Sequence, residues 1–182
     1  EAASLSSAPQ ATVAENGQVP APRASRALRA VVAEAFDTRP EATTRAVIVV
    51  HRGAIVAERY APGFDAQTRF PGWSLSKSVM NAMIGSLVQQ GRLDVHAPVA
   101  VAAWRRADDG RSQVTYDQLL RMSSGLRFDE NYESPFSDVT RMLFGVANAS
   151  AYAESRPLAA QPGTVWSYSS GSTMVLAHAL AA

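Results

Sequence analysis

The sequence predicts an α+β fold, with an antiparallel sheet flanked by helices and a mostly helical region after it. A helical apolar period over residues 26–36 is followed by two β-branched runs over residues 45–60, which indicate a hairpin. From residue 71 onward the apolar spacing is mainly helical. Because single strands do not alternate with helices, the order of elements argues against a parallel βαβ fold.

The composition is that of a globular protein with one sizeable core. Of the 182 residues, 47% are hydrophobic and 18% are charged, and 17 basic residues nearly balance 16 acidic ones. This balance gives no support for nucleic-acid binding or for an anionic membrane surface. The absence of cysteine excludes disulfides, thiolate catalysis and cysteine-bound zinc, and it fits a periplasmic or secreted bacterial protein. No apolar run reaches the roughly 18 residues that a membrane span requires.

Three segments make up the first part of the chain. Residues 1–25 are rich in Ala, Ser and Pro without an apolar period, so we expect a disordered segment or tether. Residues 26–36 carry apolar side chains at helical spacing and predict an amphipathic helix. In residues 45–60, the turn "HRG" separates the two strands of the predicted hairpin.

The stretch "GWSLSKSVMNAMIGSLVQQG", residues 72–91, predicts a helix of about four turns. Its apolar residues form a wide face, which predicts a helix buried in the middle of the domain. Gly91 stands where a left-handed residue ends a helix. The helix nevertheless opens with the polar pair Ser74 and Lys77.

Short elements are predicted for the rest of the chain. Thr115 and Gln118 have the spacing of a capping box at the start of a short helix. A long polar loop, "SSGLRFDENYESPFS", follows, and residues 138–157 contain one or two further helices. The stretch "QPGTVWSYSSGS" predicts a turn and a short extended piece before a final helix, "STMVLAHALAA". We thus assign residues 26–70 to a helix plus hairpin and residues 71–182 to a mostly helical region.

Ser74 and Lys77 lie three residues apart, so both face the same side of the predicted helix. A nucleophilic serine needs a group that takes its proton and donors for the oxyanion that forms. Lys77 can take the proton when it is neutral, and the backbone N–H of Ser74 can serve as one oxyanion donor. The alternative is that Ser74 only caps the helix and Lys77 is a solvated side chain, since S-x-x-K is a short and common pattern.

A second polar group of residues occurs at "VWSYSSGS", where Tyr168 precedes the final helix. A tyrosinate beside a lysine ammonium is a plausible general base, although Tyr168 could equally be a half-buried aromatic. A Ser-His-Asp triad is not favoured, because the three histidines, at positions 51, 96 and 178, lie in structural or solvated settings. No spacing such as H-E-x-x-H indicates a metal site, and no glycine-rich phosphate loop follows a strand, so nucleotide use is not supported. We expect no cofactor.

"WSLSKSV", "LLRMSSGLRFDENY" and "PGTVWSYSSGS", in this order, resemble the penicillin-recognising serine hydrolases. The resemblance covers residues from about 45 to the end and is greatest to the class C β-lactamase-like branch, in particular the 6-aminohexanoate-dimer hydrolases and related esterases. It implies a β-lactamase/transpeptidase-like fold, of which residues 26–182 form the N-terminal part. It further implies that the remaining sheet strands and a third motif come from a C-terminal segment or a second polypeptide.

The resemblance implies a role for each matching residue. Ser74 would be the acylated nucleophile, Lys77 its proton partner, and Tyr168 the base that also protonates the leaving group. Ser170 stands where the family's Tyr-x-Asn motif has asparagine, which favours small amides or esters over β-lactams. Ser170 and Tyr132 are expected to contact the substrate. A β-lactamase or D-peptidase, and a non-catalytic binding or sensor module, remain as alternatives.

Overall fold

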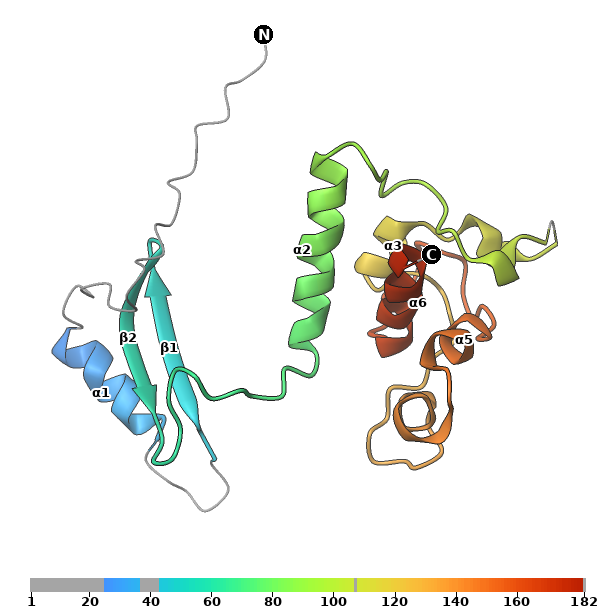
Figure 1. Ribbon diagram of the computed structural model, residues 1–182. Coiled ribbons are helices and arrows are strands. Elements are labelled where there is room, and N and C mark those ends of the chain that lie inside the picture. The colour runs from blue at the N-terminus through green and yellow to red at the C-terminus, as the bar shows by residue number, and fades with distance from the viewer. Residues whose placement is uncertain (1–24, 37–42, 107, 182) are drawn as a thin grey trace, which may run out of the picture. The chain divides into compact units, whose positions relative to one another are not determined.

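The computed structural model describes residues 25–36, 43–106 and 108–181, and the segment expected to be a tether lies almost entirely outside them. The chain divides between Phe70 and Pro71 into two compact units. The first holds α1 (Arg26–Glu34) and the hairpin of β1 (Ala46–His51) and β2 (Ala54–Tyr60). The second holds the helical remainder, so the elements are those of an α+β protein (Figure 1).

The predicted hairpin is present, and its turn lies within the stretch "HRG". Ala46 pairs with Tyr60 and His51 with Ala54, and a bulge lies between Val49 and Val50. Arg52 and Gly53 both have positive φ, at 50° and 78°, as a two-residue type I′ turn requires. Within this unit α1 packs against β2 (Figure 1) and is capped by the Ser25 hydroxyl, which accepts the Leu28 N–H at 3.1 Å.

Helix α2 spans Leu75–Gln89, within the range that the apolar pattern predicts. The Gly91 N–H donates to Val88 and the Arg92 N–H to Leu87, which is a Schellman ending with Gly91 at φ 67°. The prediction that the whole helix is buried is wrong. Ile84 is 1% exposed, whereas Val79 and Met83 are 59% and 52% exposed, because only one side of α2 packs against α6.

Short helices surround α6 (Ser170–Ala181) in the second unit. The predicted capping box of Thr115 and Gln118 is present at α3 (Tyr116–Leu120). The segment after the polar loop forms α4 (Asp138–Thr140), the π-helix η3 (Arg141–Gly145) and α5 (Ala149–Glu154), while η1 (Ala102–Trp104) and η2 (Gly110–Gln113) are 3₁₀ turns. No strand forms in residues 161–169, so the extended piece predicted there is irregular, and α6 begins two residues before the predicted start.

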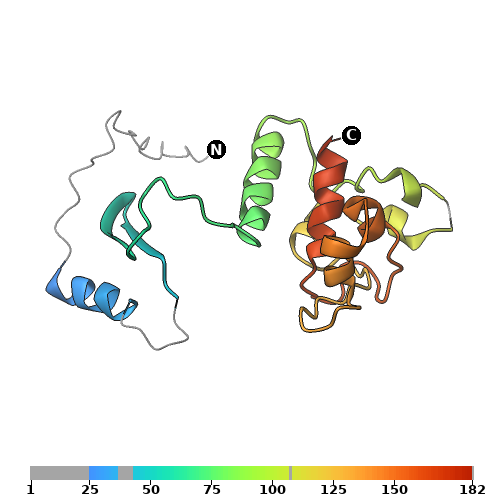
Figure 2. The ribbon, with the colours of Figure 1, turned by 60° about the horizontal axis from the view of Figure 1, so that its bottom comes forward.

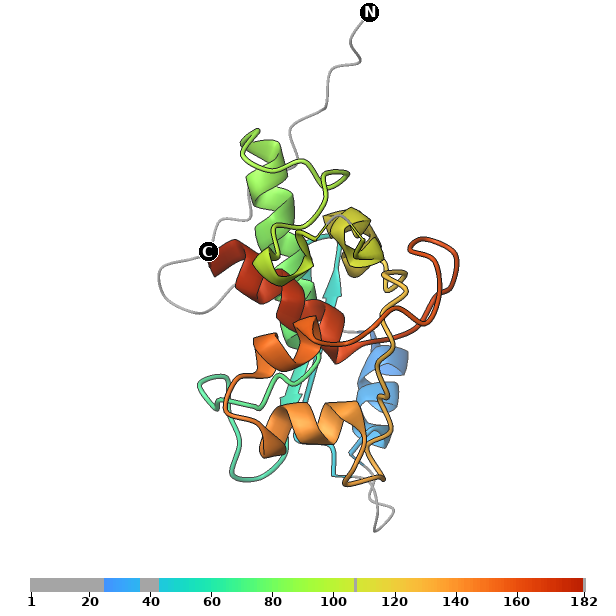
Figure 3. The same cartoon turned by 90° about the vertical axis from the view of Figure 1, so that its right-hand side faces the viewer.

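The core of this unit lies where α6 meets α3, α5 and α2 (Figures 2 and 3). The indole N–H of Trp104 and the guanidinium of Arg111 both donate to the carbonyl of Glu154, at 2.8 and 2.9 Å, which ties the 3₁₀ turns to α5. Across the described ranges, no helix combines the length and the apolar character needed to cross a membrane. The most deeply buried side chains of the core are Ile84, Trp104, Val114, Leu119, Val139, Val175 and Leu176.

Candidate active site

Ser74 begins α2 without using its hydroxyl as a helix cap. The chain enters the helix through Trp73, whose φ of 41° is unusual for a residue with a large side chain. The first turn is closed by backbone bonds three residues apart, from Leu75 to Gly72 and from Ser76 to Trp73. The Ser74 side chain accepts no capping hydrogen bond from the helix, so the cap-only alternative does not describe it. Its hydroxyl is therefore available for other partners.

Two of these partners are the side chains of Lys77 and Tyr168. Lys77 Nζ lies 3.2 Å from Ser74 Oγ, which the spacing of three residues on one helix face predicts. The Tyr168 hydroxyl lies 2.8 Å from the same oxygen, although it comes from 94 residues further along the chain. Lys77 Nζ also lies 4.9 Å from the centroid of the Tyr168 ring. The structure thus places two potential proton acceptors against one serine hydroxyl.

The start of α6 brings Ser170 to the same place. Ser170 Oγ lies 3.1 Å from Lys77 Nζ. The neighbouring Ser169 is buried, and its hydroxyl accepts the Ser172 N–H at 3.1 Å, which caps the helix. Gly171 lies so close to Phe128 that a Cβ atom there would come within 2.5 Å of the ring. This contact sets the distance between the start of α6 and the polar loop.

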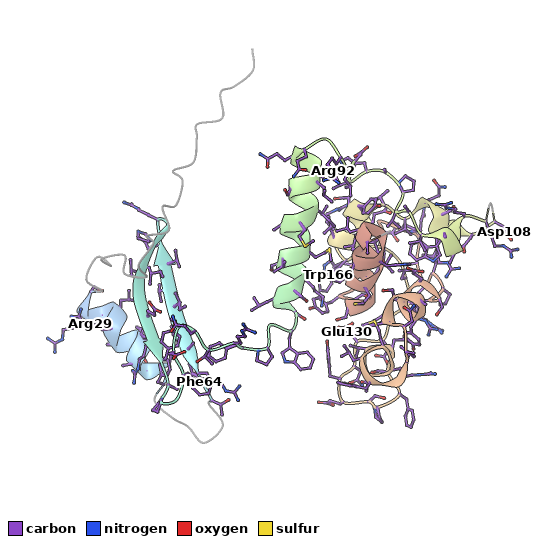
Figure 4. All side chains as sticks on the ribbon, viewed as in Figure 1. Arg29, Phe64, Arg92, Asp108, Glu130 and Trp166 are labelled. Carbon is purple, nitrogen blue, oxygen red and sulfur yellow. The ribbon has the colours of Figure 1, made fainter. Side chains whose placement is uncertain are left out.

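Glu130, in that polar loop (labelled in Figure 4), is the site residue that the sequence did not indicate. Its Oε2 accepts the Ser170 N–H at 2.8 Å, and its Oε1 accepts a short hydrogen bond from the Ser170 hydroxyl. The Tyr132 hydroxyl donates to the same Oε1 at 2.9 Å. Partial burial, together with the hydrogen bond and charge of Glu130, raises the pKa of the Tyr132 phenol, against an opposing contact with Ser170.

A small pocket of about 130 Å³ opens beside Ser74 and contains all but one of the predicted site residues. Ser74, Lys77 and Ser170 form the polar end of the pocket, and Tyr132 also lines the pocket. Tyr168 does not line it, but its hydroxyl is hydrogen-bonded to Ser74. Two larger and more open hollows lie around Gly110 and do not include Ser74. The remaining walls, which are mostly apolar, are Trp73, Ser76, Met142, Leu143, Thr173 and Met174.

His96 and His178, which belong to the same unit as Ser74, do not line the pocket. His178 Nδ1 is in short contact with the Glu154 carboxylate, which links α6 to α5 as a structural pair. Ser74 has Lys77 and Tyr168 as its side-chain partners. In the part of the chain that the structure describes, no group of three or more His, Asp or Glu side chains could hold a metal ion. The groups that meet at the Ser74 hydroxyl are thus a lysine and a tyrosine.

The chain is similar to known proteins in both sequence and structure. Residues 32–182 match the Beta-lactamase family. The 6-aminohexanoate-dimer hydrolase of Paenarthrobacter ureafaciens is 30% identical over 99 residues, which are 54% of this chain and 25% of that protein. A solved structure from Bacillus anthracis, provisionally named a 6-aminohexanoate-dimer hydrolase, is similar with a TM-score of 0.61 and 26% identity.

The match to the solved structure covers 75% of this chain and 39% of that one, so the chain spans well under half of either relative's length. These similarities support a β-lactamase/transpeptidase-like fold, to which the hairpin and the helical unit contribute. The resemblance seen in the sequence is thereby confirmed: the chain belongs to the Beta-lactamase family.

Proposed function

We propose that this chain forms the nucleophile-bearing part of a serine hydrolase that cleaves a small amide or ester through an acyl-enzyme. The observation that carries the proposal is the position of Ser74 Oγ, 3.2 Å from Lys77 Nζ and 2.8 Å from the Tyr168 hydroxyl. A serine hydroxyl is a weak nucleophile until a neighbouring group removes its proton, and such groups act from hydrogen-bond distance. Both requirements are met at one oxygen atom.

The proposed reaction has two steps. Ser74 Oγ attacks the substrate carbonyl while its proton passes to Lys77 or Tyr168, and the Tyr168 hydroxyl returns a proton to the departing amine or alcohol. Water then attacks the acyl carbonyl, one proton of that water passes through Tyr168 or Lys77 to Ser74 Oγ, and the carboxylic acid product leaves. Among the described residues the Ser74 N–H donates no hydrogen bond, so it is available to the oxyanion as the carbonyl becomes tetrahedral.

Two observations support a linear amide or ester as substrate. Ser170, whose hydroxyl lies 3.1 Å from Lys77 Nζ, stands where the family's Tyr-x-Asn motif has asparagine. Trp73, Met142, Leu143 and Met174 also give the pocket apolar walls that suit the uncharged carbon chain of an acyl group. The relatives are named for hydrolysis of the 6-aminohexanoate dimer. In the natural full-length protein, short-chain p-nitrophenyl esters should be hydrolysed faster than nitrocefin, and comparable rates would reverse this preference.

A fluorophosphonate probe tests the nucleophile. The natural full-length protein should be labelled on the tryptic peptide that carries Ser74, and Ser74→Ala should abolish both labelling and ester hydrolysis. Ser78→Ala is the matched control, because Ser78 lies one turn along the same helix and is exposed, so this variant should be labelled normally. A label that persists in Ser74→Ala would overturn the assignment, and a protein with no Ser74-dependent turnover would favour a non-catalytic module.

A further inference from the structure

We propose that Glu130 is a positioning residue that fixes the direction of the hydrogen bond between Ser170 and Lys77, so that Lys77 can receive the proton of Ser74. This inference rests on the proposed function. The Glu130 carboxylate accepts hydrogen bonds from Ser170 and Tyr132 and, among the described residues, makes none with Ser74, so any effect on the nucleophile passes through the residues between them. Those residues are Ser170 and Lys77.

The direction of the first bond follows from the atoms involved. A serine hydroxyl has one proton to donate, and an ionised carboxylate can only accept. Since Ser170 Oγ is in short contact with Glu130 Oε1, the Ser170 proton lies in that bond. Ser170 Oγ can then interact with Lys77 Nζ, 3.1 Å away, only as an acceptor. Glu130 thereby makes Ser170 a fixed acceptor for one N–H of Lys77.

This direction matters when Lys77 is a neutral amine. A neutral amine has a single lone pair, and that lone pair must face Ser74 Oγ for Lys77 to receive the Ser74 proton. If the Ser170 hydroxyl were free to rotate, it could donate to the same lone pair and compete with Ser74. With its proton held by Glu130, Ser170 can only accept, and the lone pair is left for Ser74. Glu130 thus selects the arrangement in which Lys77 can act as a base.

A purely structural role must be separated from this one. Glu130 Oε2 also accepts the Ser170 N–H at the start of α6, where a carboxylate is favoured by the helix dipole. The capping bond uses the backbone of Ser170, whereas the positioning bond uses its side chain. Replacing Ser170 with alanine removes the second and keeps the first. The two roles can therefore be measured independently in one set of variants.

The experiment is a double-mutant cycle with Glu130→Gln and Ser170→Ala, measured on ester hydrolysis by the natural full-length protein. Glutamine can still accept the Ser170 N–H, but its amide nitrogen would donate to Ser170 Oγ and reverse the bond. Glu130→Gln should lower kcat about tenfold, the scale of coupling between groups in one network, with KM and the unfolding temperature nearly unchanged. In the Ser170→Ala background, Glu130→Gln should have almost no further effect on kcat.

Asp129→Asn is the matched control, because it removes a carboxylate one residue away while keeping an acceptor for the Asn131 N–H. This variant should retain normal kcat, and Glu130→Asp should restore part of the rate lost in Glu130→Gln. Three results would overturn the inference: an unchanged kcat in Glu130→Gln, an equal loss with and without Ser170, or an equal loss in Asp129→Asn. Turnover that survives Ser74→Ala would instead refute the proposed function, and this inference with it.

Discussion

Removing the Tyr168 hydroxyl is the most direct test of the proton pathway. Tyr168→Phe deletes one oxygen atom, which lies 2.8 Å from Ser74 Oγ, and leaves the ring that Lys77 faces at 4.9 Å. Loss of a general acid–base group costs about 10²- to 10⁴-fold in rate. A hundredfold loss corresponds to about 2.7 kcal/mol of transition-state free energy. We therefore expect kcat on a p-nitrophenyl ester to fall at least a hundredfold, with little change in KM.

The leaving group allows the two roles of Tyr168 to be distinguished. If its hydroxyl protonates the leaving group, an alkyl amide should suffer more from Tyr168→Phe than a p-nitrophenyl ester, because p-nitrophenolate departs without a proton. Stopped-flow measurement of the acylation burst separates acylation from the second step.

Tyr152→Phe provides the control for general effects of losing a tyrosine hydroxyl. Tyr152 donates to Asp138 at 2.6 Å outside the pocket, so this variant should lose about 1 kcal/mol of stability and keep its rate. A Tyr168→Phe protein with a normal acylation rate on both substrates would refute the role of Tyr168.

Two further predictions concern the structure around the site. Gly171→Ala should lower the free energy of unfolding by about 1–3 kcal/mol and should also lower kcat, because the added methyl group would displace Phe128 and the start of α6. Circular-dichroism melting and ester assays would measure the two effects. An unchanged melting curve would contradict this prediction. The hydrogen bonds from Arg111 lower the pKa of Asp109 from 3.8 to about 2. Since the folded pKa is the lower one, the pair's contribution to stability should be complete above pH 4 and lost as the pH falls toward 2, a loss that Asp109→Asn should not show in acid titrations.

The sequence alone predicted those features of the site and of the fold that depend on residues close together in the chain. Ser74 and Lys77 are three residues apart on one helix, so their contact follows from helix geometry. The capping box at Thr115 and the turn at Arg52–Gly53 are likewise determined by adjacent residues. Tyr168 was indicated by its position before a helix, but only the family resemblance associated it with Ser74.

Glu130 could not be predicted in this way. Its hydrogen bonds to Ser170 span 40 residues and depend on how the polar loop packs against α6, which no local period encodes. The contact of Phe128 with Gly171 fixes that packing. The sequence does not indicate this contact, because a glycine in the first turn of a helix can be explained in many other ways. The exposure of Val79 and Met83 was not predicted either. An apolar helix face predicts burial, but the sequence does not indicate which other element packs against that face.

The strained backbone of Trp73 lowers thermal stability, while the same residue forms part of the pocket beside Ser74. A non-glycine residue in the left-handed region is strained by about 1–2 kcal/mol, and Trp73 is also 68% exposed, so little packing offsets that strain. Glycine or asparagine would relieve it, and a library selected for heat resistance alone should accumulate such replacements. Each would remove a wall of the pocket beside Ser74 and relax the turn that presents the hydroxyl. Directed evolution of this protein would therefore need turnover to be screened in every round.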